Sequence, residues 1–205
     1  MKLVKTLLAS AALVATAGAQ AAVVGSLGGG FGTFLDLSSA GLNSGSVATL
    51  AGGTVYTSDQ PFADIPAGGV FGGDFLAAGP TSTSPATLTF TNGGVDYVSF
   101  LWGSPDTFNS LTVTSTAPGA TSQQFTATGL GFSSTNGNQS FSQYVQFSGL
   151  NGSKILSLSF DNTSATDAFE SANYSITPVP EPETYALMMA GLGAIGFIAR
   201  RRKKG

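Results

Sequence analysis

The middle of the chain consists of short runs in which apolar and polar residues alternate, and no long run has the period of an amphipathic helix. In Ala86 to Thr91, for example, Leu88 and Phe90 point one way and the threonines the other. This alternation is typical of a strand that buries one face of a sheet. Tyr97 to Trp102 is apolar at nearly every position, which predicts a central strand covered on both faces.

These runs predict an all-β domain. Nine or ten strands are expected, at 31–37, 54–57, 70–76, 86–91, 97–102, 110–115, 123–128, 141–147, 154–160 and 172–176. Glycine, proline and asparagine separate them, and Asn92-Gly93 is a tight-turn signal. Short strands at this spacing predict a two-sheet β-sandwich, jelly-roll or Ig-like, although the strand order does not follow from the sequence.

The N-terminus has the pattern of a secretory signal peptide. Lys2 and Lys5 precede an apolar run from Leu7 to Ala17, and small residues follow. We expect residues 1–21 to be a signal helix that is cleaved after Ala19 or Ala21. The domain prediction therefore places the β-sandwich ectodomain at 22–178 and a tail at 179–205.

The tail combines an extended spacer, an apolar run and a basic end. Pro180 and Pro182 exclude a helix over the spacer. The uncharged run from Tyr185 to Ala199 predicts a transmembrane helix at about 184–199, of about 22 Å at 1.5 Å per residue. Because a hydrocarbon core is about 30 Å thick, this span is marginal and suits a transient anchor. The five basic residues are expected on the cytoplasmic side: Arg200, Arg201, Arg202, Lys203 and Lys204.

Val179-Pro180-Glu181-Pro182, with the apolar run and the arginine-rich end, resembles the PEP-CTERM sorting tag. The resemblance implies export by a Gram-negative bacterium, many of which make extracellular polysaccharide. It also implies processing by exosortase, a membrane-embedded cysteine protease. The chain would then pass through an intermediate anchored in the inner membrane and reach the cell surface or the extracellular matrix.

Charge and composition narrow the function of the ectodomain. Residues 22–178 contain nine acids and a single basic residue, Lys154, so this part is near −8. An acidic surface argues against nucleic acid as a partner. The chain has no cysteine and no histidine, which excludes the usual zinc sites and catalysis by either residue. We therefore expect no enzyme and no cofactor.

One segment suggests a ligand-binding site, at Trp102, Asp106 and Asn109. An exposed tryptophan could stack on a sugar while the two polar side chains bind its hydroxyls. In the alternative interpretation, Trp102 fills the core and the polar residues form a turn. Trp102-Gly103-Ser104 and Ala168-Phe169-Glu170 also resemble segments of many proteins with this tag, but Ser171-Ala172-Asn173 departs from the Asp-Asn that often follows there.

No metal site is predicted outright. A structural calcium stays open, with oxygen ligands from Asp161, Asn162, Asp167 and Glu170, because these residues are close in sequence. The sequence thus favours a non-catalytic exported surface or matrix protein associated with extracellular polysaccharide. A carbohydrate-binding module using Trp102 is the alternative. An exported hydrolase is a third hypothesis, and it requires two carboxylates that converge in a cleft.

Overall fold

The computed structural model describes residues 22–30, 32–117 and 122–177, together with Leu192 and Ile195. The predicted signal peptide, with Ala19 and Ala21, lies outside these residues. So do the spacer, the basic end and nearly all of the predicted span at 184–199. Within the described part of the chain, no helix is long and apolar enough to cross a membrane.

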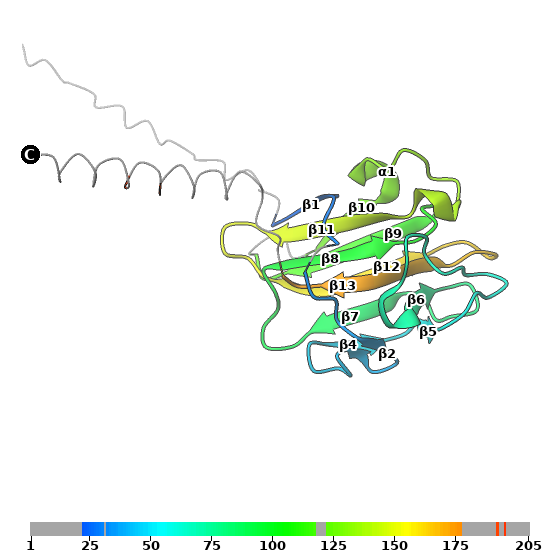
Figure 1. Ribbon diagram of the computed structural model, residues 1–205, viewed down its shortest axis with the longest axis horizontal. Helices are drawn as coiled ribbons and strands as arrows, with labels where there is room; N and C mark the ends of the chain where they lie inside the picture. The colour runs from blue at the N-terminus through cyan, green and yellow to red at the C-terminus, as the bar shows by residue number, and fades with distance from the viewer. Residues whose placement is uncertain (1–21, 31, 118–121, 178–191, 193–194, 196–205) are drawn as a thin grey trace, which may run out of the picture.

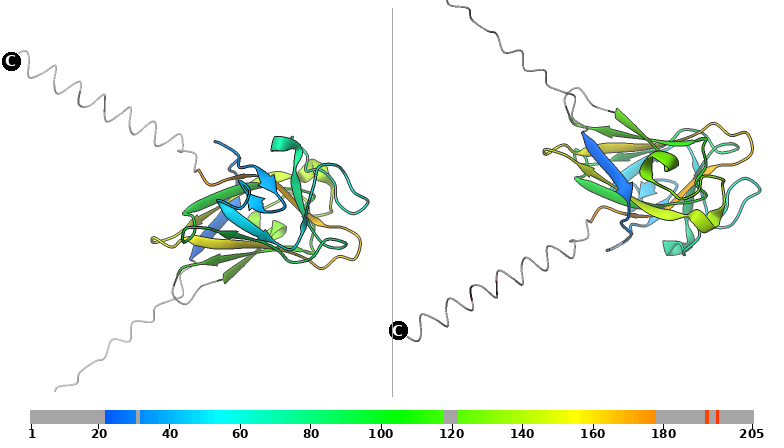
Figure 2. Two further views of the ribbon diagram at one scale, coloured as in Figure 1. Left: turned by 90° about the horizontal axis from the view of Figure 1, so that it is seen from below. Right: turned by 90° about the horizontal axis from the view of Figure 1, so that it is seen from above.

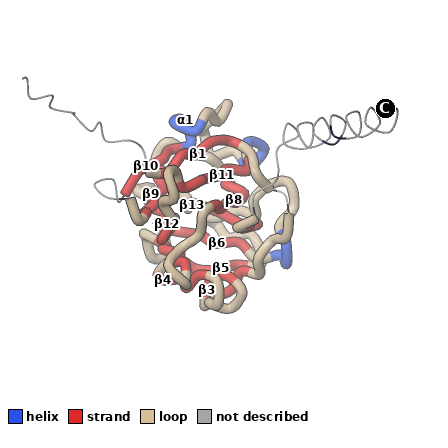
Figure 3. Tube along the Cα trace, turned by 90° about the vertical axis from the view of Figure 1, so that its left-hand side faces the viewer, coloured by secondary structure: helices blue, strands red, loops and turns tan. Residues whose placement is uncertain are grey.

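The described chain forms two antiparallel sheets that pack face to face (Figures 1 and 2). Sheet A has the order β1 (Val23–Leu27), β11 (Gln143–Gly149), β8 (Tyr97–Trp102), β13 (Phe169–Ser175), β6 (Phe75–Ala78) and β5 (Thr54–Tyr56). Sheet B has the order β10 (Ser122–Thr126), β9 (Asn109–Ser115), β12 (Ile155–Asn162), β7 (Ala86–Phe90), β4 (Ala48–Ala51), β3 (Gly41–Leu42) and β2 (Leu37–Ser38). Figure 3 shows the two sheets as two layers: β9, β12 and β4 lie in one layer, and β11, β8 and β6 lie in the other. The prediction of an all-β, two-sheet sandwich is confirmed.

Aromatic side chains fill the space between the sheets. Trp102 stacks on Phe169, with ring centroids 4.3 Å apart, and Phe169 meets Phe160 of the other sheet edge-on at 5.2 Å. Phe100 packs against Phe160 in the same edge-on manner at 5.3 Å. Since such pairs add to the stabilisation from burial, this cluster joins the two sheets at their centre.

A second apolar cluster covers the outer face of sheet A. It consists of Ala63, Phe75, Ala77, Ala168 and Ala172, with Tyr56, Phe62 and Val70 packed against them. Several of these residues come from the 57–74 segment, which connects β5 to β6 and includes the short helix η1 (Phe71–Gly73). Asn173 fastens this segment to β13, because its Oδ1 accepts from Phe71 N at 2.6 Å and its Nδ2 donates to Gly69 O at 2.8 Å.

Most predicted strands are confirmed, with shifts at their ends. Within 32–37 only Leu37 is in a strand, and β1, β3 and β4 were not predicted. The expected strand at 70–76 begins only at Phe75, because η1 precedes it. The expected strand at 123–128 ends at Thr126, whose Oγ1 accepts from Gly129 N at 3.1 Å and starts the helix α1 (Ala127–Leu130).

Trp102→Ala should destabilise the fold by about 3–5 kcal/mol, because it leaves a cavity between the sheets that the surrounding rings cannot fill. Urea denaturation followed by circular dichroism measures this loss. Phe71→Ala is a suitable control, since Phe71 is 48% exposed. Equal losses in the two variants would contradict the packing described here.

Candidate functional site

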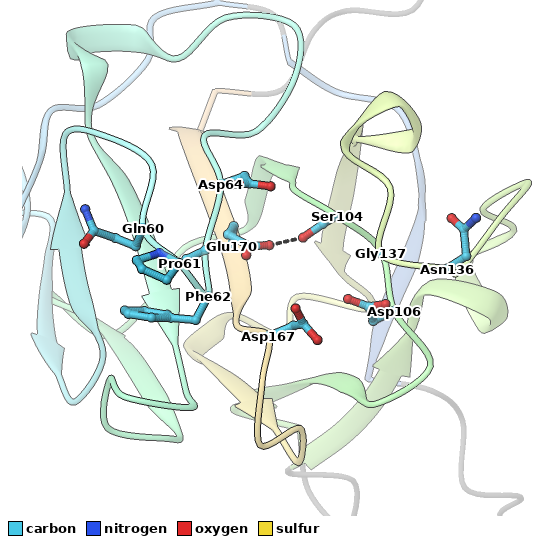
Figure 4. Close-up of a pocket in the computed structure, with 11 residues that line it drawn as sticks. Gln60, Pro61, Phe62, Asp64, Ser104, Asp106, Asn136, Gly137, Asp167 and Glu170 are labelled. Atoms are coloured by element: carbon cyan, nitrogen blue, oxygen red, sulfur yellow. Dashed lines mark hydrogen bonds between the residues drawn. The ribbon is translucent and has the colours of Figure 1, made fainter.

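A pocket of about 180 Å³ lies beside the C-terminal end of β8 and the start of β13. Four segments line it, and four of its residues are acidic (Figure 4). The lining residues are Gln60, Pro61, Phe62, Ala63, Asp64, Ser104, Asp106, Asn136, Gly137, Asp167 and Glu170. The pocket therefore brings together carboxylates that are far apart in the sequence.

Glu170 lies at the inner side of this pocket. Alternation along β13 places Phe169 between the sheets and Glu170 on the outer face, under the 57–74 segment, where it is only 2% exposed. Ser104 Oγ donates a hydrogen bond to Glu170 Oε2 (Figure 4), and Gly103 N donates to Glu170 O at 2.9 Å. A Cβ at Gly103 would lie 2.9 Å from both Glu170 Cβ and Pro66 Cγ, so this close approach requires glycine.

Gln139, at the start of the short helix η2 (Gln139–Phe141), connects three of the segments around the pocket. Its Oε1 accepts from Ser104 N at 3.4 Å, and its Nε2 donates to Asp64 O at 3.2 Å. Ser142 Oγ also donates to Gln139 Oε1, at 2.9 Å. Ser104 is thus held in place by a side chain that the sequence analysis did not single out.

Asp106 is buried and its carboxylate has no hydrogen-bond donor among the described residues. It is 6% exposed, and it forms an isolated backbone bridge with Asn136. A Cβ at Gly137 would lie 2.8 Å from Asp106 Oδ1, and Gly137 has a φ of 74°. In Figure 4 the carboxylates of Asp106 and Asp167 point toward one another across the pocket.

Burial changes the proton affinity of two of these acids. It raises the pKa of Glu170 to about 8, with smaller contributions from the negative charges of Asp106 and Asp64, although the hydrogen bond from Ser104 acts in the opposite direction. Burial also raises the pKa of Asp106 to about 6, with a contribution from Asp167. Glu170 therefore keeps its proton at neutral pH, whereas Asp106 is largely ionised.

The predicted ligand-binding residues do not come together. Trp102 is completely buried between the sheets, which leaves no ring face on which a sugar could stack, and its Nε1 has no hydrogen-bond partner. Asn109 is also buried, and its Oδ1 accepts from Asn162 Nδ2 at 2.6 Å. Of the three predicted residues, Asp106 alone lines the pocket.

The four residues that were considered as calcium ligands do not lie in one site. Asp161 Oδ1 accepts from Ser84 Oγ at 2.8 Å, and Asn162 bonds to Asn109, so neither lines the pocket. Asp167 and Glu170 do line it. Among the described residues, no group of three or more acidic side chains is placed to hold a metal ion.

The facing carboxylates of Asp106 and Asp167 are also relevant to the hydrolase hypothesis, which requires two acids in a cleft. The acid with the highest pKa, Glu170, would be the natural proton donor. However, it is almost inaccessible and is hydrogen-bonded to Ser104. The geometry thus provides an acidic pocket in which the protonated group is poorly placed to reach a substrate.

Glu170→Gln should make the fold more stable at high pH. Glu170 loses its proton at about pH 8 when folded, against a reference value of 4.5. Between these values the folded state binds more protons than the unfolded state, so the free energy of unfolding falls as pH rises. Glutamine resembles the protonated acid, and we therefore expect little effect at pH 4 and a gain of a few kcal/mol at pH 9, at about 1.4 kcal/mol per pKa unit.

Urea denaturation from pH 4 to pH 9, without added divalent cation, measures this effect. Asp36→Asn makes the same kind of change at an exposed acid and serves as the control. An unchanged slope of stability against pH in Glu170→Gln would contradict the buried, protonated state of Glu170.

Comparison with known protein families gives one match, to the PEP-CTERM protein-sorting motif, over residues 178–203. Comparison with curated proteins and with solved structures finds no match. The match covers the predicted spacer, the apolar run and the basic end up to Lys203, and none of the β-sandwich. The motif implies export and processing by an exosortase-type membrane protein. The chain thus carries a PEP-CTERM protein-sorting motif, which follows the β-sandwich.

Proposed function

We propose that this protein is a non-catalytic component of the cell surface or extracellular matrix, delivered by its C-terminal motif and retained in extracellular polysaccharide. One observation carries the proposal. The last strand, β13, ends at Ser175, and the sorting motif begins at residue 178. Because the motif shares no residue with a strand, a protease can remove it while the sandwich stays intact.

The outer face of sheet B supports retention among sugars. Two rows of hydroxyl side chains cross this face, perpendicular to the strands. The rows are Thr89–Ser157–Thr114 and Thr87–Ser159–Thr112. Hydroxyl groups both donate and accept hydrogen bonds, directly or through water, as the hydroxyls of a polysaccharide do.

The charges of the sandwich fit the same environment. Lys154, the single basic residue of 22–178, pairs with Asp96 at 2.8 Å. The remaining acids keep a net negative charge, which favours solubility and disfavours binding to anionic lipid or nucleic acid. A neutral, hydrated polymer would not be repelled by this negatively charged surface.

Changing the motif should block processing. We expect the wild-type chain to end near 180–183 in the extracellular fraction of a host that carries the sorting protease. In the triple variant Pro180→Ala, Glu181→Ala, Pro182→Ala, the chain should instead keep Lys203-Lys204 and stay in the inner membrane. Fractionation with mass spectrometry of the C-terminus measures both.

Pro61→Ala, at an exposed proline of the sandwich, is the control for this experiment and should be processed normally. Normal release of the triple variant, or a wild-type chain that always keeps its basic end, would contradict the proposed delivery.

Removing the hydroxyl groups of the row Thr89–Ser157–Thr114 should weaken the protein's retention on the host's polysaccharide. We expect the variant Thr89→Val, Ser157→Ala, Thr114→Val to co-sediment several-fold less than wild type, with an unchanged melting temperature. Ser26→Ala with Thr54→Val removes two exposed hydroxyls of sheet A and is the matched control. Equal retention of all three proteins would show that this face does not hold the polymer.

A further inference from the structure

We propose that the acidic pocket beside β13 is a calcium site, with the carboxylates of Asp106 and Asp167 as its charged ligands. Both line the pocket and point toward one another across it (Figure 4). Asp106 comes from the turn between β8 and β9, and Asp167 from the turn between β12 and β13. Two separate loops thus place a carboxylate in the same pocket.

The carboxylate of Asp106 lacks a partner among the described residues. A buried carboxylate is costly unless hydrogen bonds or an opposite charge compensate it. Asp106 is 94% buried, and no described residue donates a hydrogen bond to its side chain. Glu170, the other buried acid of the pocket, has Ser104 as its donor. Asp106 therefore lacks a positively charged or hydrogen-bonding partner on the side that faces the pocket.

The side chains that line the pocket include acids and no base. No lysine or arginine is among its lining residues, and Lys154 is paired with Asp96 elsewhere. Asp106 and Asp167 carry charges of the same sign and face one another across the pocket. A cation between the two carboxylates would replace this repulsion by attraction.

The remaining ligands would be neutral oxygens. The amide side chains of Gln60 and Asn136 line the pocket but point away from the two carboxylates (Figure 4), so water would supply the other oxygens. Gly137 leaves open the space beside Asp106 Oδ1 that a Cβ would occupy. Ca²⁺ accepts six to eight oxygens in irregular geometry, whereas Mg²⁺ requires a nearly ideal octahedron. Two carboxylates from separate loops, in a pocket that imposes no octahedron, therefore suit calcium better.

The affinity should be low. No three acidic side chains converge in the described part of the chain, so two carboxylates provide the charge. Extracellular modules bind calcium with dissociation constants of roughly 10⁻⁴–10⁻³ M. Such a site would fill outside the cell, which is where the proposed function places the protein. The binding experiment itself does not depend on that location.

The test is thermal unfolding of the full chain in detergent, with CaCl₂ from 0.1 to 10 mM or with EGTA. We expect 10 mM CaCl₂ to raise the melting temperature by about 5 °C. In Asp106→Asn this shift should disappear, while the melting temperature in EGTA stays the same or rises because an unpaired charge is gone. Asp167→Asn should weaken binding at least tenfold, as measured by isothermal titration calorimetry. Asp36→Asn, at an exposed acid, should keep the full shift.

Three results would overturn the calcium site. The wild type could show no shift up to 10 mM CaCl₂, or Asp106→Asn could keep the wild-type shift. MgCl₂ at the same ionic strength could give an equal shift, which would mean screening of the acids rather than a site. The loss of calcium binding in Asp106→Asn, with export and processing unchanged, would separate this proposal from the proposed function.

Discussion

Strand β13 is buried at each of its seven positions, from Phe169 to Ser175. Its inner side chains contact the aromatic cluster between the sheets, and its outer side lies under the 57–74 segment. A strand of a two-sheet sandwich usually exposes one face, so this cover is what creates a third layer on sheet A. Without it, Glu170 and its neighbours would lie in water.

The pocket is a consequence of this third layer. The 57–74 segment brings Phe62 and Asp64 over β13, while Gly103 allows the turn after β8 to approach the same strand closely. Asn173 and Gln139 fasten the covering segments through their side-chain amides. The acids are therefore held by the scaffold rather than by one another, which is the arrangement that a ligand site needs and a purely structural network does not.

Much of the sandwich could be predicted from the sequence because its pattern is local. Leu88 and Phe90 alternate with threonines, and Tyr97 to Trp102 is apolar at nearly every position, so β7 and β8 follow from period and composition. The strands β2 and β3 have only two residues each, too few for any period to be visible. The helix at Ala127 was not predicted because a single capping hydroxyl, at Thr126, ends the strand there.

Less of the candidate site could be predicted from local sequence patterns. Asp106 was predicted as a ligand-binding residue because it is near Trp102 in the sequence. Trp102, however, is buried in the core. Asp64 and Gly137 have no local signal that links them to Asp106, because their proximity depends on how long loops fold over sheet A. The sorting motif is the opposite case, since Val179 to Pro182 and the basic end can be read without any fold.

The central claim is that the outer cover of β13 keeps the carboxyl group of Glu170 out of water. Carbon-13 NMR of the Glu170 side-chain carboxyl, recorded as a function of pH, tests it most directly. The account predicts a carboxyl that stays protonated at pH 7 and titrates at a pKa of about 8. A titration near the reference value of 4.5 would mean that the 57–74 segment does not cover the strand, and would contradict it.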